Sequence, residues 1–125
     1  DGSLTTLHAN GCSDALNRLE TMVLMAGMEI PIKAIREYIE NAIDIVVNVS
    51  RLSDGRRKVT SICEVDGFKD DMIVLKEIFN FKQTGLTENG EVDGAFDLKK
   101  RVPTVYKKIK SRGINDLDDI FNFKK

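Results

Sequence analysis

Residues 43–65 read IDIVVNVSRLSDGRRKVTSICEV, and this stretch decides the fold. From Ile43 to Val49 side chains alternate with period two, as in a strand with one buried face, and Val46 adds apolar character to the other face. Asp54-Gly55 is a strong signal for a tight hairpin turn. Residues 59–65 then form a second strand, so the stretch predicts an antiparallel hairpin.

The pattern continues on the C-terminal side. Turn residues lie at 66–67 and 70–71, and residues 72–81 read as a third strand, which completes an antiparallel meander. Residues 83–97 carry three glycine-containing turn signals and predict a loop or a small irregular hairpin. Pro103 begins a helix that ends at Gly113, and Asn115 caps a short helix over 116–121.

Two helices are predicted before the hairpin. The first begins near a cap at Ser13 or Asp14 and ends at Gly27, and the second opens at Pro31. Apolar residues recur at helical spacing in both: Leu16, Leu19, Met22, Val23 and Ala26 in the first, and Ile32, Ile35, Ile39, Ala42 and Ile43 in the second. Residues 4–7 favour a strand at the very start of the chain.

Composition places the chain in the globular class. It has 125 residues, of which 42% are hydrophobic, enough for one domain with a core. The formal net charge of −1 argues against wholesale binding to nucleic acid or membrane. Cys12 and Cys63 lie outside any CxxC spacing and read as free thiols in a reducing compartment. No apolar run approaches the ~20 residues that cross a bilayer.

Familiar catalytic motifs are missing from these residues. No glycine precedes a lysine, so there is no phosphate-binding Gly-Lys-Ser/Thr loop. No GxSxG nucleophile motif occurs, and a single histidine with two remote cysteines does not supply a zinc site at the familiar ligand spacings. The residues by themselves do not compose an active site.

Two residues remain as candidates. His8, the only histidine, follows the predicted opening strand. In open α/β sheets ligands bind at that end of a strand, and an imidazole there suits a phosphate. The alternative is a structural histidine. Arg18 is either a surface residue paired with Asp14 or Glu20, or a contact to phosphate or to another subunit.

A basic run follows the meander. It comprises Lys99, Lys100 and Arg101, then Lys107, Lys108, Lys110 and Arg112. Such runs are usually solvated helix faces, and contact with RNA, acidic lipid or an acidic partner is the alternative. Tyr106 is the only aromatic residue within the run. Since single-stranded nucleic acid stacks its bases on aromatic side chains, this weakens the case for such a partner.

The opening residues carry a family resemblance. Residues 2–10, GSLTTLHAN, closely resemble the His box of the type II/IV secretion ATPases, the ring-forming motors of bacterial secretion and pilus assembly. Residues 18–27, 31–37, 42–46 and 50–60 look like the Flp/Tad pilus assembly branch in particular. The resemblance is strong over residues 2–67 and looser beyond. Gly11-Cys12 departs from the family, which often has a basic residue in that turn.

The resemblance implies an α/β fold, the C-terminal portion of a RecA-like P-loop ATPase domain. Residues 1–82 would belong to that domain, 83–97 would be a loop or irregular hairpin, and 98–125 a helical tail. The phosphate-binding loop and the Walker B strand would lie before Asp1, so we expect no ATP hydrolysis by the chain alone. His8 matches the histidine near the terminal phosphate, and Arg18 matches a recurrent arginine after the His box.

The same resemblance implies cofactors, partners and location. The intact protein would use ATP and Mg²⁺, neither of which we expect in this chain alone, form a homohexameric ring, and drive pilin assembly or protein export. It would work in the cytoplasm at the inner face of the bacterial inner membrane, beside secretion platform proteins. No nucleic acid partner is expected. The opening strand would lose its upstream neighbours, so we expect either fraying at residues 1–10 or dimerisation through the exposed strand. The alternative function is a non-catalytic module that docks a membrane-platform protein through the meander and basic tail.

Overall fold

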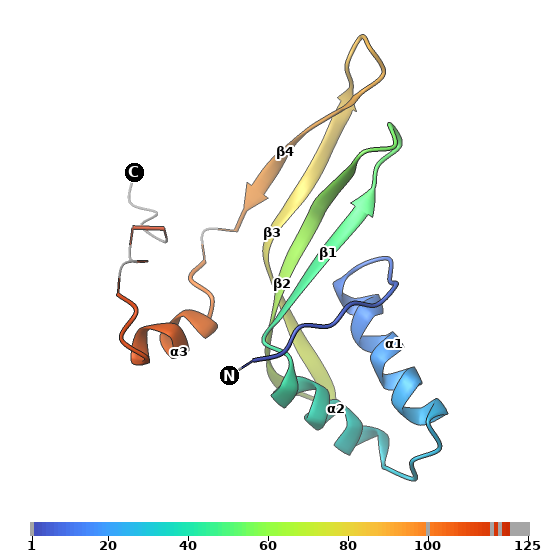
Figure 1. Cartoon of the computed structure of the whole chain (residues 1–125), viewed down its shortest axis with the longest axis vertical. Helices are drawn as coiled ribbons and strands as arrows, with labels where there is room; N and C mark the ends of the chain where they lie inside the picture. Colours follow the sequence, from blue (N-terminus) through green and yellow to red (C-terminus); the bar gives the residue numbers. More distant parts are fainter. Residues whose placement is uncertain (1, 100, 116, 118, 121–125) are drawn as a thin grey trace.

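The computed structural model describes residues 2–99, 101–115, 117, 119 and 120. Four strands form one antiparallel sheet in the order β1-β2-β3-β4 (Figure 1). The elements in chain order are α1 (Cys12–Met25), α2 (Ile32–Ala42), β1 (Ile45–Arg51), β2 (Arg57–Lys69), β3 (Met72–Leu86), β4 (Val92–Leu98) and α3 (Val105–Ser111). The predicted α/β class, with two helices, an antiparallel meander and a C-terminal helix, is confirmed.

The hairpin turns explain why the meander forms. Gly55 adopts a φ of 83°, in the left-handed region that the β1–β2 turn requires. The β2–β3 turn is closed by Asp70 and Asp71, with φ of 51° and 60°, and aspartate is one of the few side chains that tolerate this region. Two tight turns therefore keep three successive strands antiparallel.

Residues 83–97 are more regular than the sequence suggested. Of the two alternatives, the hairpin is confirmed: β3 continues to Leu86 and pairs with β4 from Phe79↔Leu98 to Leu86↔Val92. One register shift, between Gln83 and Gly85, interrupts the pairing. The helix predicted from Pro103 to Gly113 is shorter, Val105–Ser111. The helix predicted over 116–121 falls largely outside the described residues.

The predicted opening strand is wrong for this chain. Residues 2–9 form no helix or strand, and Leu4 is fully exposed. A strand needs a neighbour for its backbone N–H and C=O groups, and β1 pairs with β2 alone among the described residues. The apolar and β-branched residues of this segment favour strand structure but have no strand to pair with.

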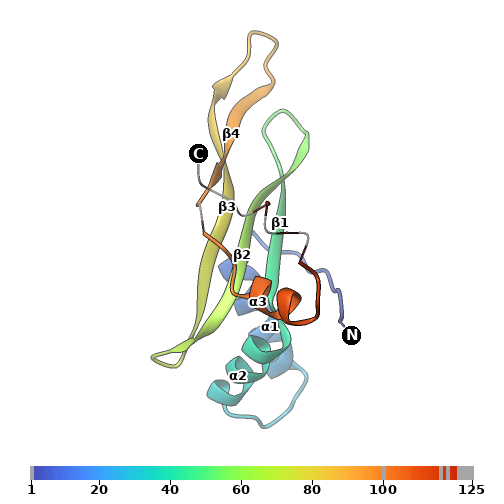
Figure 2. The ribbon, with the colours of Figure 1, turned by 90° about the vertical axis from the view of Figure 1, so that its left-hand side faces the viewer.

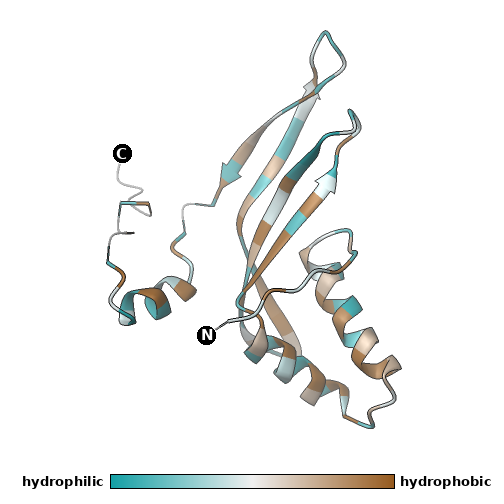
Figure 3. Ribbon diagram, viewed as in Figure 1, coloured by the Kyte–Doolittle hydropathy of each residue, from teal (hydrophilic) through white to brown (hydrophobic). Residues whose placement is uncertain are grey.

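The core lies between two helices and one end of the sheet. Leu16 of α1 packs with Ile35 and Ile39 of α2, and all three are buried. The sheet contributes Val46, Val65, Ile73 and Leu75 from the ends of β1, β2 and β3 nearest the helices. Figure 1 shows α1 and α2 beside this end, and apolar residues concentrate there in Figure 3. The helices thus cover one face of the sheet at one end only.

The C-terminal segment covers the opposite face at the same end (Figure 2). Glu64 of β2 is 2% exposed and accepts hydrogen bonds from the Arg101 guanidinium, at 3.1 Å, and from the Val105 backbone N–H, at 2.8 Å. Pro103 and Tyr106 are buried. A buried carboxylate requires such partners, so Glu64 fixes the start of α3 on the sheet.

Candidate functional site

A groove lies between the N-terminal segment and α1. Its volume is about 450 Å³, and its lining residues are Thr6, Leu7, His8, Arg18, Thr21 and Met22. Both candidate residues predicted from the sequence, His8 and Arg18, therefore line the same groove. His8 comes from the extended segment before α1, and Arg18 comes from the second turn of that helix.

Asp14 joins the two sides of this groove. Its carboxylate accepts a hydrogen bond from the backbone N–H of Asn10 at 2.8 Å and another from Nε of Arg18 at 2.9 Å. These bonds, the Asn10 bond first, lower the pKa of Asp14 below its usual 3.8. The carboxylate therefore ties the turn after His8 to Arg18 one helical turn further along α1.

The start of α1 differs from the prediction. Gly11 occupies the N-cap position and no side chain caps it, so neither Ser13 nor Asp14 is the N-cap residue. Asp14 instead reaches back from the third helical position to Asn10, which satisfies an N–H ahead of the helix. The predicted pairing of Arg18 with Asp14 or Glu20 resolves in favour of Asp14.

The groove has the chemistry to bind an anion. The Arg18 side chain is 49% exposed, and among the described residues only its Nε is engaged, by Asp14. Its terminal N–H groups therefore remain as donors. An imidazole and a guanidinium that line one groove suit a phosphate group, because both donate hydrogen bonds to its oxygens. Thr21 donates its hydroxyl to the Asn17 carbonyl at 2.9 Å and keeps an acceptor site only.

A divalent cation does not fit these residues. Within the described ranges, no group of three His, Cys, Asp or Glu side chains lies close enough together to hold a metal ion. Any Mg²⁺ that accompanies a nucleotide would need ligands from elsewhere, since oxygen ligands from several carboxylates or waters are its usual partners.

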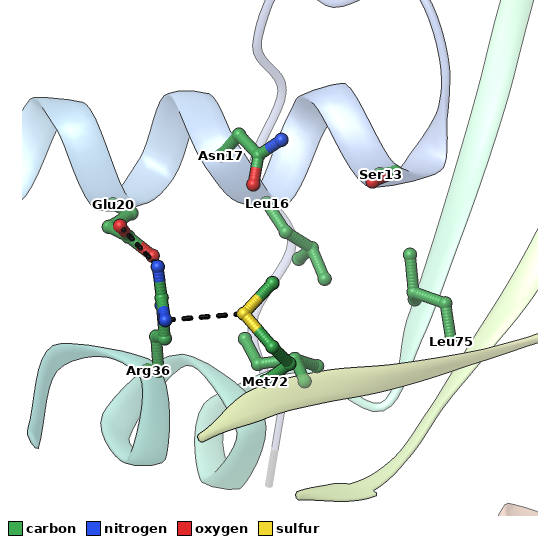
Figure 4. A pocket seen from close by; sticks show the side chains of 8 residues that line it. Ser13, Leu16, Asn17, Glu20, Arg36, Met72 and Leu75 are labelled. Atoms are coloured by element: carbon green, nitrogen blue, oxygen red, sulfur yellow. Dashed lines mark hydrogen bonds and ion pairs between the residues drawn. The ribbon is translucent and has the colours of Figure 1, made fainter. Parts of the chain in front are cut away.

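A smaller cavity of about 50 Å³ lies where α1, α2 and the start of β3 meet (Figure 4). Arg36 of α2 forms a two-pronged ion pair with Glu20 of α1, at 2.7 and 3.1 Å, which raises the pKa of Arg36. Its Nη1 donates to the carbonyl of Asp71 at 2.9 Å and lies 3.3 Å from Sδ of Met72. Arg36 therefore holds two helices and the β2–β3 turn together.

Sequence reasoning missed this arginine. Glu20 and Arg36 lie on different helices, and no spacing rule relates residues across a helix–helix connection. The only available signal was Arg36 beside the apolar stripe residue Ile35, and that signal is common to many surface arginines.

Much of the basic run is already paired. Lys99 contacts Asp97 at 2.8 Å and Glu77 at 3.6 Å, Arg101 binds Glu64, and Lys108 lies 3.5 Å from Asp44. Lys100 is outside the described residues. Among the residues that the structure describes, no helix has both the length and the apolar character to span a membrane.

Comparison with known proteins adds one relative. No family model matches the chain. The chain is similar to the conjugal transfer protein TrbB of Rhizobium radiobacter, with 31% identity over 70 residues, which make up 56% of this chain. It covers 20% of the length of TrbB, so it spans about a fifth of that relative. This similarity supports the coarser form of the resemblance, to the secretion ATPases, and it does not distinguish the Flp/Tad branch.

Proposed function

We propose that this chain is the nucleotide-sensing part of a secretion motor ATPase. The observation that carries the proposal is the placement of His8 and Arg18 on one groove, within the residues that resemble the His box. The similarity to a conjugal transfer protein supports the same class of motor.

The groove offers a mechanism for sensing. A terminal phosphate between His8 and Arg18 would draw the N-terminal segment toward α1, because both side chains donate hydrogen bonds to phosphate oxygens. Asp14 carries that movement to Asn10 and the first turn of α1. Leu16 of the next turn lies in the core against α2, so a displaced α1 would move its neighbours in the fold.

The finer assignments are also part of the proposal. The intact protein belongs to the Flp/Tad branch, contains a complete RecA-like domain, uses ATP and Mg²⁺, and works as a homohexamer in pilin assembly or protein export. It acts in the cytoplasm at the inner face of the inner membrane, beside platform proteins. The nucleotide loop and the metal ligands come from other parts of that protein, so the chain alone is inactive.

An amide NMR titration of the chain with inorganic triphosphate tests the sensing role. We expect shifts centred on His8, Asn10 and Arg18, lost in His8→Ala and weakened in Arg18→Ala. Lys69→Ala is the matched control, since Lys69 is an exposed cation at the end of β2, far along the chain from the groove. Equal shifts in all variants, or shifts centred on α3, would rule out sensing at this groove.

A turnover assay tests the inactivity separately. We expect no phosphate release from ATP by the pure chain. Turnover that His8→Ala abolishes would show that the chain carries its own active site.

The docking function is the second candidate, and the exposed face of α3 favours it. Lys107 and Lys108 are exposed there, and the one ion pair of Lys108 within the described part of the chain is a long contact to Asp44. In the intact protein, reversing both charges separates the candidates. Lost export with an unchanged ATPase rate would indicate docking, and a lost ATPase rate would indicate a role within the ring.

A further inference from the structure

The two cysteines have no role in the proposed function, yet the fold brings them together. Cys12 begins α1 and Cys63 lies in the middle of β2, and they are 6% and 8% exposed. Both are free thiols. The two thiols are neighbours: after burial, the Cys12 side chain is the next cause that raises the pKa of Cys63.

Contacts around Cys12 fix this position independently. Its Sγ lies 3.3 Å from Oγ of Ser61 and 3.7 Å from the carbonyl oxygen of Val46. Val46 is the cross-strand partner of Cys63, and Ser61 is two residues before Cys63 on the same face of β2. The Cys12 thiol therefore rests on the patch of sheet that Cys63 occupies.

We propose that Cys12 and Cys63 form a reversible intramolecular disulfide by exchange with a small disulfide such as oxidised glutathione. Cys12 attacks the small disulfide first, forms a mixed disulfide and releases one small thiol. The Cys63 thiolate then attacks the Cys12 sulfur and expels the second small thiol. Two protein thiols become one disulfide, and the two electrons reduce the oxidant to two thiols.

Local opening at the start of α1, together with the pKa of Cys63, sets this order of attack. Cys12 follows the exposed loop at Asn10, so opening the first turn of α1 uncovers it first. The pKa of Cys63 is raised to about 12, chiefly by burial, then by the neighbouring Cys12 and by Glu77 of β3. Cys63 is therefore a poor first nucleophile at neutral pH and acts in the closing step, when Cys12 already holds the leaving group.

The disulfide would join the first residue of α1 to the sheet. His8 and Asn10 lie just before that residue, so the bond would restrict movement of the loop that borders the groove. The proposal does not depend on nucleotide sensing, because it rests only on the two thiols and their neighbours.

Redox titration of the folded chain tests the proposal. The chain is equilibrated with mixtures of reduced and oxidised glutathione, blocked with N-ethylmaleimide and digested. We expect a cross-linked pair of peptides carrying Cys12 and Cys63. The equilibrium constant for forming this disulfide with oxidised glutathione should be about 100-fold or more higher in the folded chain than in urea. The oxidised chain should melt roughly 5–15 °C higher than the reduced chain.

The kinetics provide a second readout. Below the pKa of Cys63 its thiolate fraction rises about tenfold per pH unit, and the closing step should accelerate accordingly from about pH 7 to about pH 9. Cys12→Ser and Cys63→Ser serve as controls, and each should give at most one mixed disulfide and no rise in melting temperature. Mixed disulfides alone in the wild-type chain, or a cross-link no more favourable in the folded chain than in urea, would overturn the proposal.

Discussion

The carboxylate of Asp54 lies 2.7 Å from the backbone nitrogen of Val92, and this hydrogen bond joins the β1–β2 turn to the start of β4. Asp54 also accepts hydrogen bonds from the backbone N–H of Arg56 and from its guanidinium. Arg56 in turn donates to the carbonyl of Val92 at 3.2 Å. The Asp54 side chain is 5% exposed, and Val92 is buried, so two hairpin ends close against each other.

Replacing Asp54 by Asn should lower the stability of the fold in a pH-dependent way. The Val92 N–H, followed by Arg56, lowers the pKa of Asp54 from 3.8 to about 2. Because the folded-state pKa is depressed, this stabilisation is present above about pH 4 and disappears as the pH falls toward about 2. The melting temperature of the wild-type chain should therefore drop over that window. The melting temperature of Asp54→Asn should be lower than the wild-type value at neutral pH and should vary less with pH. Glu88→Gln, an exposed acid in the neighbouring turn, should retain the wild-type profile.

Replacing Glu64 by Gln should loosen α3 from the sheet. The substitution removes the charge that Arg101 and the Val105 N–H share at a buried position, and we expect a loss of roughly 1–3 kcal/mol in urea unfolding. Hydrogen exchange at Val105 should accelerate more than exchange in β1. Glu77→Gln is the control, because Glu77 is 36% exposed in its contact with Lys99. Equal destabilisation by both variants would contradict a special role for the buried carboxylate.

Gly94→Ala should destabilise the β3–β4 hairpin. A Cβ atom at this position would lie 2.5 Å from the Lys82 carbonyl oxygen and 2.5 Å from Cζ of Phe81. Relief requires a shift of backbone and of a packed ring, which costs about 1–3 kcal/mol. Gly85 on the adjacent strand has no atom within 4 Å of the same position, so Gly85→Ala should be close to neutral. Comparable unfolding midpoints for the two variants would show that Phe81 moves freely.

Arg36→Lys should weaken the joint between α1, α2 and the β2–β3 turn despite keeping the charge. Lysine cannot reproduce the two-pronged bond to Glu20 while also donating to the Asp71 carbonyl. We expect a lower urea midpoint with an unchanged slope, together with faster hydrogen exchange around Asp71. Lys33→Ala on the same helix should have a much smaller effect, because its ion pair with Asp71 is exposed on both sides.

The sequence predicted elements whose signals are local. Asp54-Gly55 and the alternation from Ile43 to Val49 identified the first hairpin, because turn chemistry and side-chain period act within a few residues. The β3–β4 pairing was harder to predict, because Gly94 reads as a breaker although its missing side chain is what admits the Phe81 ring. The opening strand failed for the opposite reason: its residues favour a strand, but pairing depends on a neighbour.

The candidate site was predicted residue by residue and not as an arrangement. His8 and Arg18 were singled out separately, and their common groove depends on the path of residues 2–9, which follow no helical or strand period. Glu64 gave no signal at all, since its partners Arg101 and Val105 lie 37 and 41 residues later in the chain. Contacts between segments far apart in the sequence cannot be predicted from the periodicity of either segment.

The distribution of packing along the sheet has a mechanical consequence. Helices α1 and α2 pack on one face of the sheet and the α3 segment packs on the other, both at the same end. The far hairpin ends are bonded to each other through Asp54 and Val92. The sheet is thus held by side-chain packing at one end and by a hydrogen bond between hairpin ends at the other. Because Asp54 bonds the start of β4 to the β1–β2 turn, a displacement of one hairpin end would have to carry the other with it or break this hydrogen bond.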